Sequence, residues 1–447
     1  MADLSKYTES LSDKKRRLLE LMLAEKRRKA AAPEAGPDRP ERTEKGIPRR
    51  PVVSPVPVSF AQQRLWFIDQ LDPGTPAFNI PAAVRIRGTL DLPVMRRGLA
   101  EIVRRHETLR TRFGADGGRP VQIVDGDAVI DPPVVDLSRL SAAEQLPVVQ
   151  RFITAECQRS FDLERCPLVR THLLRLGEAD HVLVLMMHHI IGDVWSVRVL
   201  MRELATLCGA FAAGRPSPLP ELPIQYGDYA LWQREWMRGP ALAEGLAYWK
   251  GQLTGMPGEL ELPADHPRPP VQSVWGAKRF LHVPRGLADR VRALGREESA
   301  SSFMTLLAAW KALLHRYTGQ DDIVVGAPVA NRSRTELEPL IGFFVNSLVL
   351  RTDLSGDPSF RALLRRQREV VLGAFSHQDF PFERLVEVLQ PERNMSRNPL
   401  FQTDFILQNS PRSAYEVPGL TFEPLPVENG TAQLDMTLDL WEEADGL

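Results

Sequence analysis

The stretch H-V-L-V-L-M-M-H-H-I-I-G-D-V-W-S, residues 181–196, predicts a buried strand, a turn and a helix in succession. Val182 to Met187 form a continuous apolar run bounded by polar groups, which is typical of a strand buried on both faces. The run is too short to cross a membrane. From Trp195 to Phe211, apolar residues recur at helical spacing. We therefore infer a strand–turn–helix unit around which the rest of the chain is arranged.

Two adjacent histidines end the predicted strand. Because side chains alternate across a strand, His188 and His189 must point to opposite sides, one toward a cleft and the other into packing. Divergent histidines do not readily ligate one ion, so a metal site that includes Asp193 has little support and we predict none. A neutral histidine could instead act as a general base, since its ordinary pKa lies near neutral pH. The spacing alone fits a pair of core histidines equally well.

Composition restricts the class of protein. The chain has 447 residues and is 43% hydrophobic, which is enough for two or three ordinary domains. Its 56 Lys and Arg balance 57 Asp and Glu, so bulk charge favours neither nucleic acid nor an anionic membrane as a partner. Cys157, Cys166 and Cys208 show no metal or disulfide spacing, and we expect buried free thiols in a reducing compartment. No apolar stretch approaches the roughly 20 residues of a membrane helix and no signal-peptide core is present, so we expect a cytoplasmic protein.

The chain divides into four predicted parts. Residues 1–29 contain a basic helix with Ser12 as its N-cap, which is either an ordinary solvated helix or a docking element for an acidic partner. Residues 30–57 hold seven prolines and few large apolar residues, which predicts an extended linker. Two lobes of mixed α/β structure should follow, over residues 58–256 and 257–447.

Hydrophobic periodicity predicts the elements of both lobes. Helices are expected over 93–107, 141–160, 195–213, 226–252, 287–298, 302–317 and 360–375, with a helical turn after 381; strands are expected up to 124 and over 169–176, 182–187, 278–283, 323–327, 402–408 and 433–440. The strands at 169–176 and 182–187 should form a hairpin.

Seven short motifs follow one another in a fixed order. They are S-F-A-Q-Q-R-L-W (59–66), R-H-E-T-L-R-T-R-F (105–113), H-H-I-I-G-D-V-W-S (188–196), Y-G-D-Y-A-L-W (226–232), I-G-F-F-V-N-S-L (341–348), H-Q-D-F-P-F-E (377–383) and R-N-M-S-R-N-P-L (393–400). The third resembles the H-H-x-x-x-D-G signature of condensation domains in nonribosomal peptide synthetases, and the order is the one those domains show. The sequence has no glycine-rich phosphate loop, no G-x-S-x-G elbow and no H-E-x-x-H pair, so nucleotide binding, serine-esterase chemistry and zinc proteolysis lack their usual motifs.

The resemblance implies a mixed α/β fold, a pseudo-dimer of two chloramphenicol acetyltransferase-like lobes in a V shape with a central tunnel. Two carrier proteins would feed the tunnel, each presenting its substrate as a thioester on a phosphopantetheine arm. A donor acyl or peptidyl group would enter from one face and an aminoacyl acceptor from the other. An amide bond would form between them, and the domain itself would bind no cofactor.

The resemblance also assigns residues. His189 would contact the acceptor amine, either removing a proton or chiefly orienting it, because a free α-amino group with a pKa of about 8 needs little help from a base. His188 would be buried behind the strand, and Asp193 would form an ion pair with an arginine, Arg110 or Arg279. Four residues would bind substrate: Val194, Trp195, Asn346 and Ser347. For Asn346 and Ser347, ordinary strand pairing is the alternative. The remaining four would serve mainly in lobe packing and in arginine–carboxylate brackets: Arg64, Arg110, Asp228 and Arg279.

Two features depart from the family pattern. Val194 occupies the glycine slot of the signature, where a branched side chain could crowd the site and glycine would permit backbone angles that valine resists. The chain stops at Leu447, where family members continue, so we expect a fragment of a longer synthetase with a downstream adenylation domain.

Several roles remain open within the resemblance. The motifs look most like domains that join an L-configured donor to an L-aminoacyl acceptor. With Met1 at the head of the chain, the donor would come in trans from an upstream synthetase subunit, and a starter role with a fatty or polyketide acyl donor is the alternative. An epimerase shares the double histidine but not its flanking motifs, and a heterocyclisation domain would carry aspartates instead. A non-catalytic scaffold that binds carrier proteins is the alternative of a different class. We expect a monomer.

Overall fold

The computed structural model describes residues 46–51, 55–391, 394, 396–408, 414–443 and 445–447. The predicted basic helix at 1–29 and the first part of the predicted linker lie outside these residues. The described helices are α3 (Phe60–Leu71), α4 (Leu92–Arg105), α5 (Ala142–Cys157), α6 (Val194–Ala212), α7 (Tyr226–Trp236), α8 (Pro240–Leu253), α9 (Arg285–Glu297), α10 (Ser302–Thr318), α11 (Phe360–Ser376) and α12 (Phe382–Leu389). The described strands are β1 (Val56–Pro57), β2 (Asn79–Gly88), β3 (Thr111–Asp116), β4 (Arg119–Val124), β5 (Val134–Asp136), β6 (Val169–Gly177), β7 (Asp180–His188), β8 (Asp322–Val329), β9 (Asn346–Asp353), β10 (Thr403–Gln408), β11 (Tyr415–Val417), β12 (Leu420–Leu425) and β13 (Met436–Trp441).

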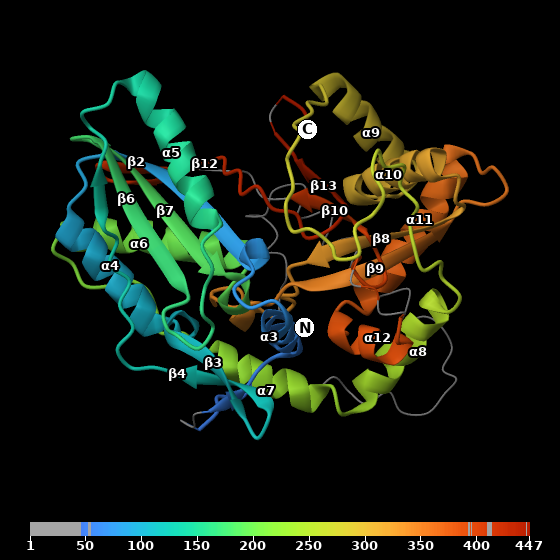
Figure 1. Ribbon diagram of the computed structural model, residues 1–447, viewed down its shortest axis with the longest axis horizontal. Helices are drawn as coiled ribbons and strands as arrows, with labels where there is room; N and C mark the ends of the chain where they lie inside the picture. Colours follow the sequence, from blue (N-terminus) through green and yellow to red (C-terminus); the bar gives the residue numbers. More distant parts are fainter. Residues whose placement is uncertain (1–45, 52–54, 392–393, 395, 409–413, 444) are drawn as a thin grey trace, which may run out of the picture. The chain divides into compact units, whose positions relative to one another are not determined.

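The first lobe is built on a six-stranded sheet with the strand order β11-β12-β2-β7-β6-β5. Figure 1 shows α4, α5 and α6 grouped around this sheet. The predicted strand becomes β7, and its residues Val182 to Met187 are all buried, because side chains of both faces enter one hydrophobic core. Its antiparallel pairing with β6 confirms the predicted hairpin.

The second lobe is built on a four-stranded sheet with the order β13-β10-β8-β9. Strand β10 runs parallel to both β8 and β13, whereas β8 and β9 are antiparallel. Helices α10 and α11 lie side by side in this lobe (Figure 1) and pack against each other. Both helices contribute residues to its hydrophobic core. The mixed α/β class and the two-lobe arrangement predicted from the sequence are confirmed.

Three predictions about elements differ from the structure. The helix expected over 226–252 is divided into α7 and α8, because Gly239 and Pro240 interrupt it. The strand expected at 278–283 is absent from the described structure: residues 278–282 are exposed, and Val283 exchanges backbone hydrogen bonds with Leu447 without forming a strand. Helix α8 lies before the predicted lobe boundary at residue 256, yet its Trp249 and Leu253 belong to the core of the second lobe.

The two halves of the chain are joined by a strand exchange. Strand β12 follows β10 in the second half, but it pairs with β2 and so belongs to the sheet of the first lobe. Phe422 on β12 is fully buried in the first hydrophobic core. The first lobe is therefore completed by a segment from the far end of the chain.

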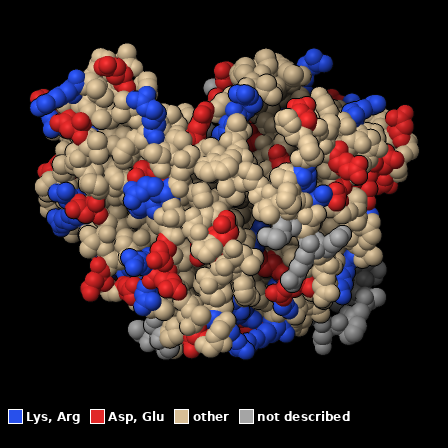
Figure 2. All heavy atoms as spheres, viewed as in Figure 1, with Lys and Arg blue, Asp and Glu red and all other residues tan. Residues whose placement is uncertain are grey.

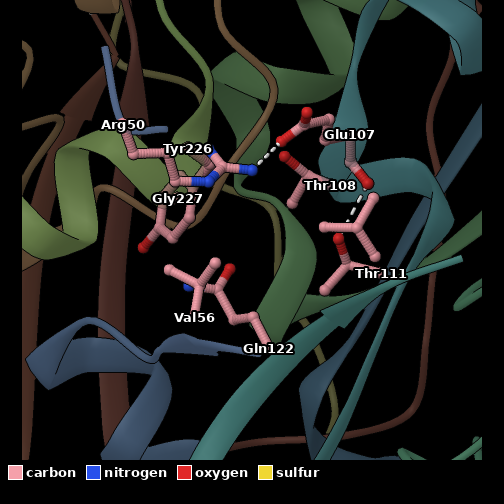
Figure 3. A pocket seen from close by; sticks show the side chains of 9 residues that line it. Arg50, Val56, Glu107, Thr108, Thr111, Gln122, Tyr226 and Gly227 are labelled. Carbon is pink, nitrogen blue, oxygen red and sulfur yellow. Dashed lines mark hydrogen bonds and ion pairs between the residues drawn. The ribbon is translucent and has the colours of Figure 1, made fainter. Parts of the chain in front are cut away.

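The packed region begins earlier than the predicted boundary at Val58. Ile47 is buried in a third hydrophobic cluster that includes Tyr226 and Phe344. Arg50 forms ion pairs with Glu107 and with Asp228, the latter at 2.8 Å. Figure 3 shows its guanidinium reaching Glu107 beside a cavity of about 10 Å³. The physical reason for the difference is that the buried Ile47 and the two ion pairs of Arg50 hold this short proline-flanked segment to the body.

Charges of both signs are interspersed over the face shown in Figure 2, in keeping with the near-zero net charge of the sequence. Within the described residues, no helix is both long enough and apolar enough to span a bilayer. Cys157 and Cys208 are buried free thiols, whereas Cys166 is partly exposed. Burial raises the pKa of all three, to about 11 for Cys157 and Cys166 and about 12 for Cys208, so none is activated as a nucleophile.

Candidate active site

The histidine pair lies at the end of β7, where the chain turns into α6. His188 is the last residue of the strand, and His189 begins a short 3-10 turn that ends at Ile191. The two side chains enter different environments, as strand alternation predicts. Only His189 lines the large cavity of the protein.

His188 is enclosed by the first lobe. Its Nδ1 accepts a hydrogen bond of 3.1 Å from the backbone N–H of Ile190. The rings of Phe78 and Phe161 lie 6.5 and 6.0 Å from its own ring, centroid to centroid. This burial lowers the pKa of His188 to about 3, so the imidazole is neutral at neutral pH.

His189 faces the cavity with a defined tautomer. Its Nδ1 lies 2.9 Å from the carbonyl oxygen of Gly192, and because a carbonyl only accepts, Nδ1 carries the proton. Nε2 is then left with a free lone pair. Burial lowers the pKa of His189 and nearby Asp193 partly opposes that shift, so the ring is neutral at neutral pH. The ring of Phe343 packs at 4.6 Å and limits its movement.

Asp193 is fully buried and fixes the turn. Its Oδ1 caps α6 by accepting hydrogen bonds of 2.7 Å from both the backbone N–H and the hydroxyl of Ser196. Its Oδ2 accepts from the backbone N–H of Phe344 at 3.2 Å. Arg332 Nη2 lies 3.2 Å from Oδ1 and forms the ion pair. Asp193 therefore connects the histidine turn with the second half of the chain.

The arginine partner of Asp193 differs from both sequence candidates. Arg110 instead lies 4.0 Å from Glu107, and Arg279 is exposed. Arg332 also donates to the Leu340 carbonyl at 2.8 Å. The predicted kind of interaction is present, but the sequence carries no local signal for Arg332, because its position depends on how the loop after β8 folds against the first lobe.

Val194 is the first residue of α6. Its φ is not positive, so the position imposes no conformation that valine resists, contrary to the backbone strain considered from the sequence. Its side chain is 53% exposed and lines the cavity. Two residues earlier, a Cβ on Gly192 would lie 2.2 Å from the Met187 sulfur. Position 192, and not position 194, therefore requires glycine for steric reasons.

A cavity of about 490 Å³ opens beside His189 and is walled by both lobes. Val194, Trp195 and Ser347 line it, as does Arg64, for which the sequence predicted mainly a packing role. Among the described residues, no group of three or more histidine, cysteine or acidic side chains is arranged to hold a metal ion. The remaining lining combines apolar side chains with a substantial share of polar and charged ones, which gives the cavity groups that could orient a substrate.

Asn346 does not line the cavity, in contrast to the predicted substrate-binding role. Its Nδ2 donates to the carbonyls of Gln378 and Phe380, both at 2.7 Å, and its Oδ1 accepts from the N–H of Phe382 at 3.0 Å. The amide thus holds the start of α12 against β9. Asp228 forms a bracket with Arg50, the kind of role predicted for it.

Sequence reasoning missed two acidic side chains in the cavity wall, Glu383 and Asp404. Burial raises the pKa of both, to about 7 for Asp404. Glu383 lies in one of the quoted motifs, which could have drawn attention to it. Asp404 lies in an apparently ordinary strand, and a charged residue at an inward position of a buried strand is the signal that could have identified it.

The condensation domain family model matches residues 53–447, so the chain belongs to the condensation domains of nonribosomal peptide synthetases. Condensation domains are acyltransferases that form amide bonds in nonribosomal peptide synthesis. The predicted pseudo-dimer of chloramphenicol acetyltransferase-like lobes is confirmed by the likeness of the fold to solved structures of this family.

Three similar proteins define the match. A linear gramicidin synthase protein of Brevibacillus parabrevis is 47% identical over 394 residues, which cover 88% of this chain and 5% of that protein. Phosphinothricin tripeptide synthetase PhsC of Streptomyces viridochromogenes is 42% identical over 445 residues, 98% of this chain and 40% of that protein. The crystal structure of the X-domain from teicoplanin biosynthesis is 28% identical with a TM-score of 0.80, covering 89% of this chain and 88% of that one. The chain thus spans 5% of the length of the first of these synthetases and 40% of the second.

Proposed function

We propose that this chain joins a carrier-bound acyl or peptidyl thioester donor to the amino group of a carrier-bound aminoacyl acceptor, with L-configured substrates on both sides. The observation that carries the proposal is His189, a neutral imidazole that lines the large cavity with Nε2 unprotonated. Both substrates would arrive on phosphopantetheine arms, and the domain itself would use no further cofactor.

The reaction is a direct acyl transfer. The acceptor nitrogen attacks the donor thioester carbonyl, and the carbon–sulfur bond breaks as the donor pantetheine leaves as a thiol. The nitrogen loses one proton, and the amide product stays on the acceptor arm. Because Nε2 of His189 is an acceptor, it would hold the attacking amine through one N–H and orient its lone pair toward the carbonyl.

Positioning is the main role that we assign to His189. Burial lowers its pKa, which makes it a weak base, whereas a free α-amino group already loses its proton at a pKa of about 8. His188 and Asp193 would act through the shape of the turn. Among the alternatives, geometry favours an enzyme over a scaffold, since Val194 leaves His189 open to the cavity.

The test is a mass-spectrometric condensation assay with acyl and L-aminoacyl carrier proteins. His189→Ala should lower product formation by about two orders of magnitude or more with little change in melting temperature. His172→Gln is the control, because His172 also has a pKa lowered by burial but does not line the cavity. Near-normal turnover by a folded His189→Ala variant would refute the assignment.

The same assay separates the alternatives. Product with a fatty or polyketide acyl donor, and none with aminoacyl or peptidyl donors, would indicate a starter domain. Binding of both carriers with no product from any pair would indicate a scaffold. An inverted α-carbon without amide formation would indicate an epimerase.

We further propose a cytoplasmic monomer that receives its donor from an upstream synthetase protein and acts beside a downstream adenylation domain. Residues 1–45, which carry eight Lys and Arg at 14–17 and 26–29, would dock the upstream carrier. Deleting them should weaken the apparent affinity for a free upstream carrier, more strongly at low salt, and leave the melting temperature nearly unchanged. Unchanged affinity would remove the docking role.

A further inference from the structure

One wall of the cavity is formed by alternate residues of β10. Asp404, Ile406 and Gln408 line the cavity, whereas Phe405 and Leu407 on the other face pack into the core of the second lobe. This alternation follows from strand geometry. Strand β10 lies between β8 and β13, so the Asp404 carboxyl is carried by an interior strand with little freedom to move.

Asp404 has an unmet hydrogen-bonding requirement. Its Oδ1 is buried and has no hydrogen-bond partner among the residues that the structure describes. Burial raises the pKa of Asp404 to about 7, although the positive charge of Arg64 acts in the opposite direction. A buried carboxyl oxygen without a donor is costly, and a bound molecule with an N–H or O–H group would remove that cost.

The neighbouring strand leaves room for this carboxyl. Asp404 lies opposite Gly326 on β8. A Cβ at Gly326 would lie 2.1 Å from Oδ1 of Asp404 and 2.3 Å from Cε2 of Phe401. Any side chain at that position would therefore displace the carboxyl, and the pair Asp404–Gly326 forms a fitted niche in the cavity wall.

Two other polar side chains of the cavity wall, those of Asn398 and Gln408, already donate hydrogen bonds within the protein. Asn398 Nδ2 donates to Gln272 Oε1 at 3.1 Å and to the Gln433 carbonyl at 2.6 Å. Farther along β10, Gln408 Nε2 donates to Asp439 Oδ1 at 3.4 Å. Asp404 differs from Asn398 and Gln408, because its Oδ1 has no donor among the residues that the structure describes.

We infer that Asp404 is a specificity-determining residue, which selects a pantetheine-bound substrate whose side chain donates a hydrogen bond into the niche beside Gly326. The inference rests on the proposed function for the nature of the substrates. It assigns Asp404 no part in the acyl transfer itself, for which the proposed function names His189.

The experiment uses shape-matched pairs of aminoacyl groups, asparagine with leucine and lysine with 2-aminoheptanoic acid, in which a methyl group replaces the ammonium. Each group is offered first as acceptor and then as donor on a carrier protein. The protein should prefer the hydrogen-bonding member by about tenfold or more in one of these positions. The lysine pair tests an ammonium group as the hydrogen-bond donor, and the asparagine pair tests a neutral amide. Comparing the acceptor and donor positions shows which of the two substrates places its side chain beside Asp404.

Asp404→Leu should abolish this preference, measured as the ratio of kcat/KM for the two members of a pair, whereas Asp404→Asn, which keeps an acceptor oxygen, should retain part of it. Gln408→Leu is the matched control on the same face of β10 and should leave the preference unchanged. The inference is overturned if the protein shows no preference in either position, if Asp404→Leu keeps it, or if Gln408→Leu abolishes it equally.

Binding separates this inference from the proposed function. Non-reactive pantetheine amides of the same aminoacyl groups are titrated, with NMR detection, into the protein and into His189→Ala. Selective binding that Asp404→Leu removes would support the niche even if no amide product forms with any pair. Product formation without selective binding or selective turnover would leave the proposed function standing and refute the role of Asp404.

Discussion

At the scale of single residues, two adjacent histidines acquire different properties because their side chains enter different surroundings where β7 ends and the turn begins. His188 is enclosed by aromatic rings and accepts a backbone hydrogen bond, whereas His189 reaches the cavity. Strand alternation allowed this division to be predicted from the sequence. The arginine that pairs with Asp193 could not be predicted, because Arg332 is 139 residues away and nothing local marks it.

The buried His188 should make the protein sensitive to acid. Its pKa is about 3 in the folded chain and about 6.5 when unfolded, so between these pH values only the unfolded chain binds the proton. Stability contributed by the neutral ring is therefore present above pH 6.5 and is lost as the pH falls, by about 1 kcal/mol per pH unit. His188→Asn keeps an acceptor for the Ile190 N–H but cannot titrate.

The measurement is the free energy of unfolding in urea between pH 7 and pH 5. The native protein should lose stability more steeply than His188→Asn, by about 1 kcal/mol per pH unit. Burial also lowers the pKa of His172, His181 and His189. The free energy of unfolding of the variant should therefore still fall with decreasing pH, but less steeply than that of the native protein. Parallel curves for the two proteins would contradict the assignment to His188.

At the scale of elements, the local sequence pattern predicts a helix or strand well where the segment buries a stripe or a run of its own apolar side chains. The predicted helix at 195–213 and the predicted strand at 182–187 correspond closely to α6 and β7. The strand expected at 278–283 is wrong, because its apolar residues Phe280 and Leu281 find no partner strand and remain exposed. Strand β2 was missed, since Pro81 and the short residues around it weaken the strand pattern that pairing with β7 and β12 enforces.

The start of α6 depends on more than an ordinary cap. Asp193→Ala removes the cap and leaves Arg332 buried without its carboxylate, so we expect a loss of about 3–5 kcal/mol in stability together with activity. Asp91→Ala is the matched control, because Asp91 caps α4 with one exposed hydrogen bond of 3.0 Å to Val94 and should cost about 1 kcal/mol. The loss of stability in Asp193→Asn should be smaller than in Asp193→Ala and larger than in Asp91→Ala. A stable but inactive Asp193→Ala protein would make Asp193 a participant in the chemistry.

At the scale of the whole molecule, the order of segments along the chain does not coincide with the order of lobes in space. Strand β12 lies near the end of the sequence but pairs along its whole length with β2. No sequence pattern states which sheet a short strand will join, because pairing is decided by edges that become available only when the lobes form. A second lobe in the later part of the chain was therefore predictable in outline, whereas the packing of α8 in the second core and of β12 in the first sheet was not.

This exchange makes the two halves depend on each other for stability. Phe422 is fully buried in the first core and lies opposite Ile86 of β2, so Phe422→Ala should destabilise the first lobe by about 3–5 kcal/mol, although it lies in the second half of the sequence. Thr421→Ala, one residue earlier on the half-buried opposite face, should cost about 1 kcal/mol or less. Urea unfolding measures both, and a fragment of residues 46–256 should show no cooperative melting because its sheet lacks β12. If Phe422→Ala were as stable as Thr421→Ala and the fragment melted cooperatively, the first lobe would fold without the exchanged strand.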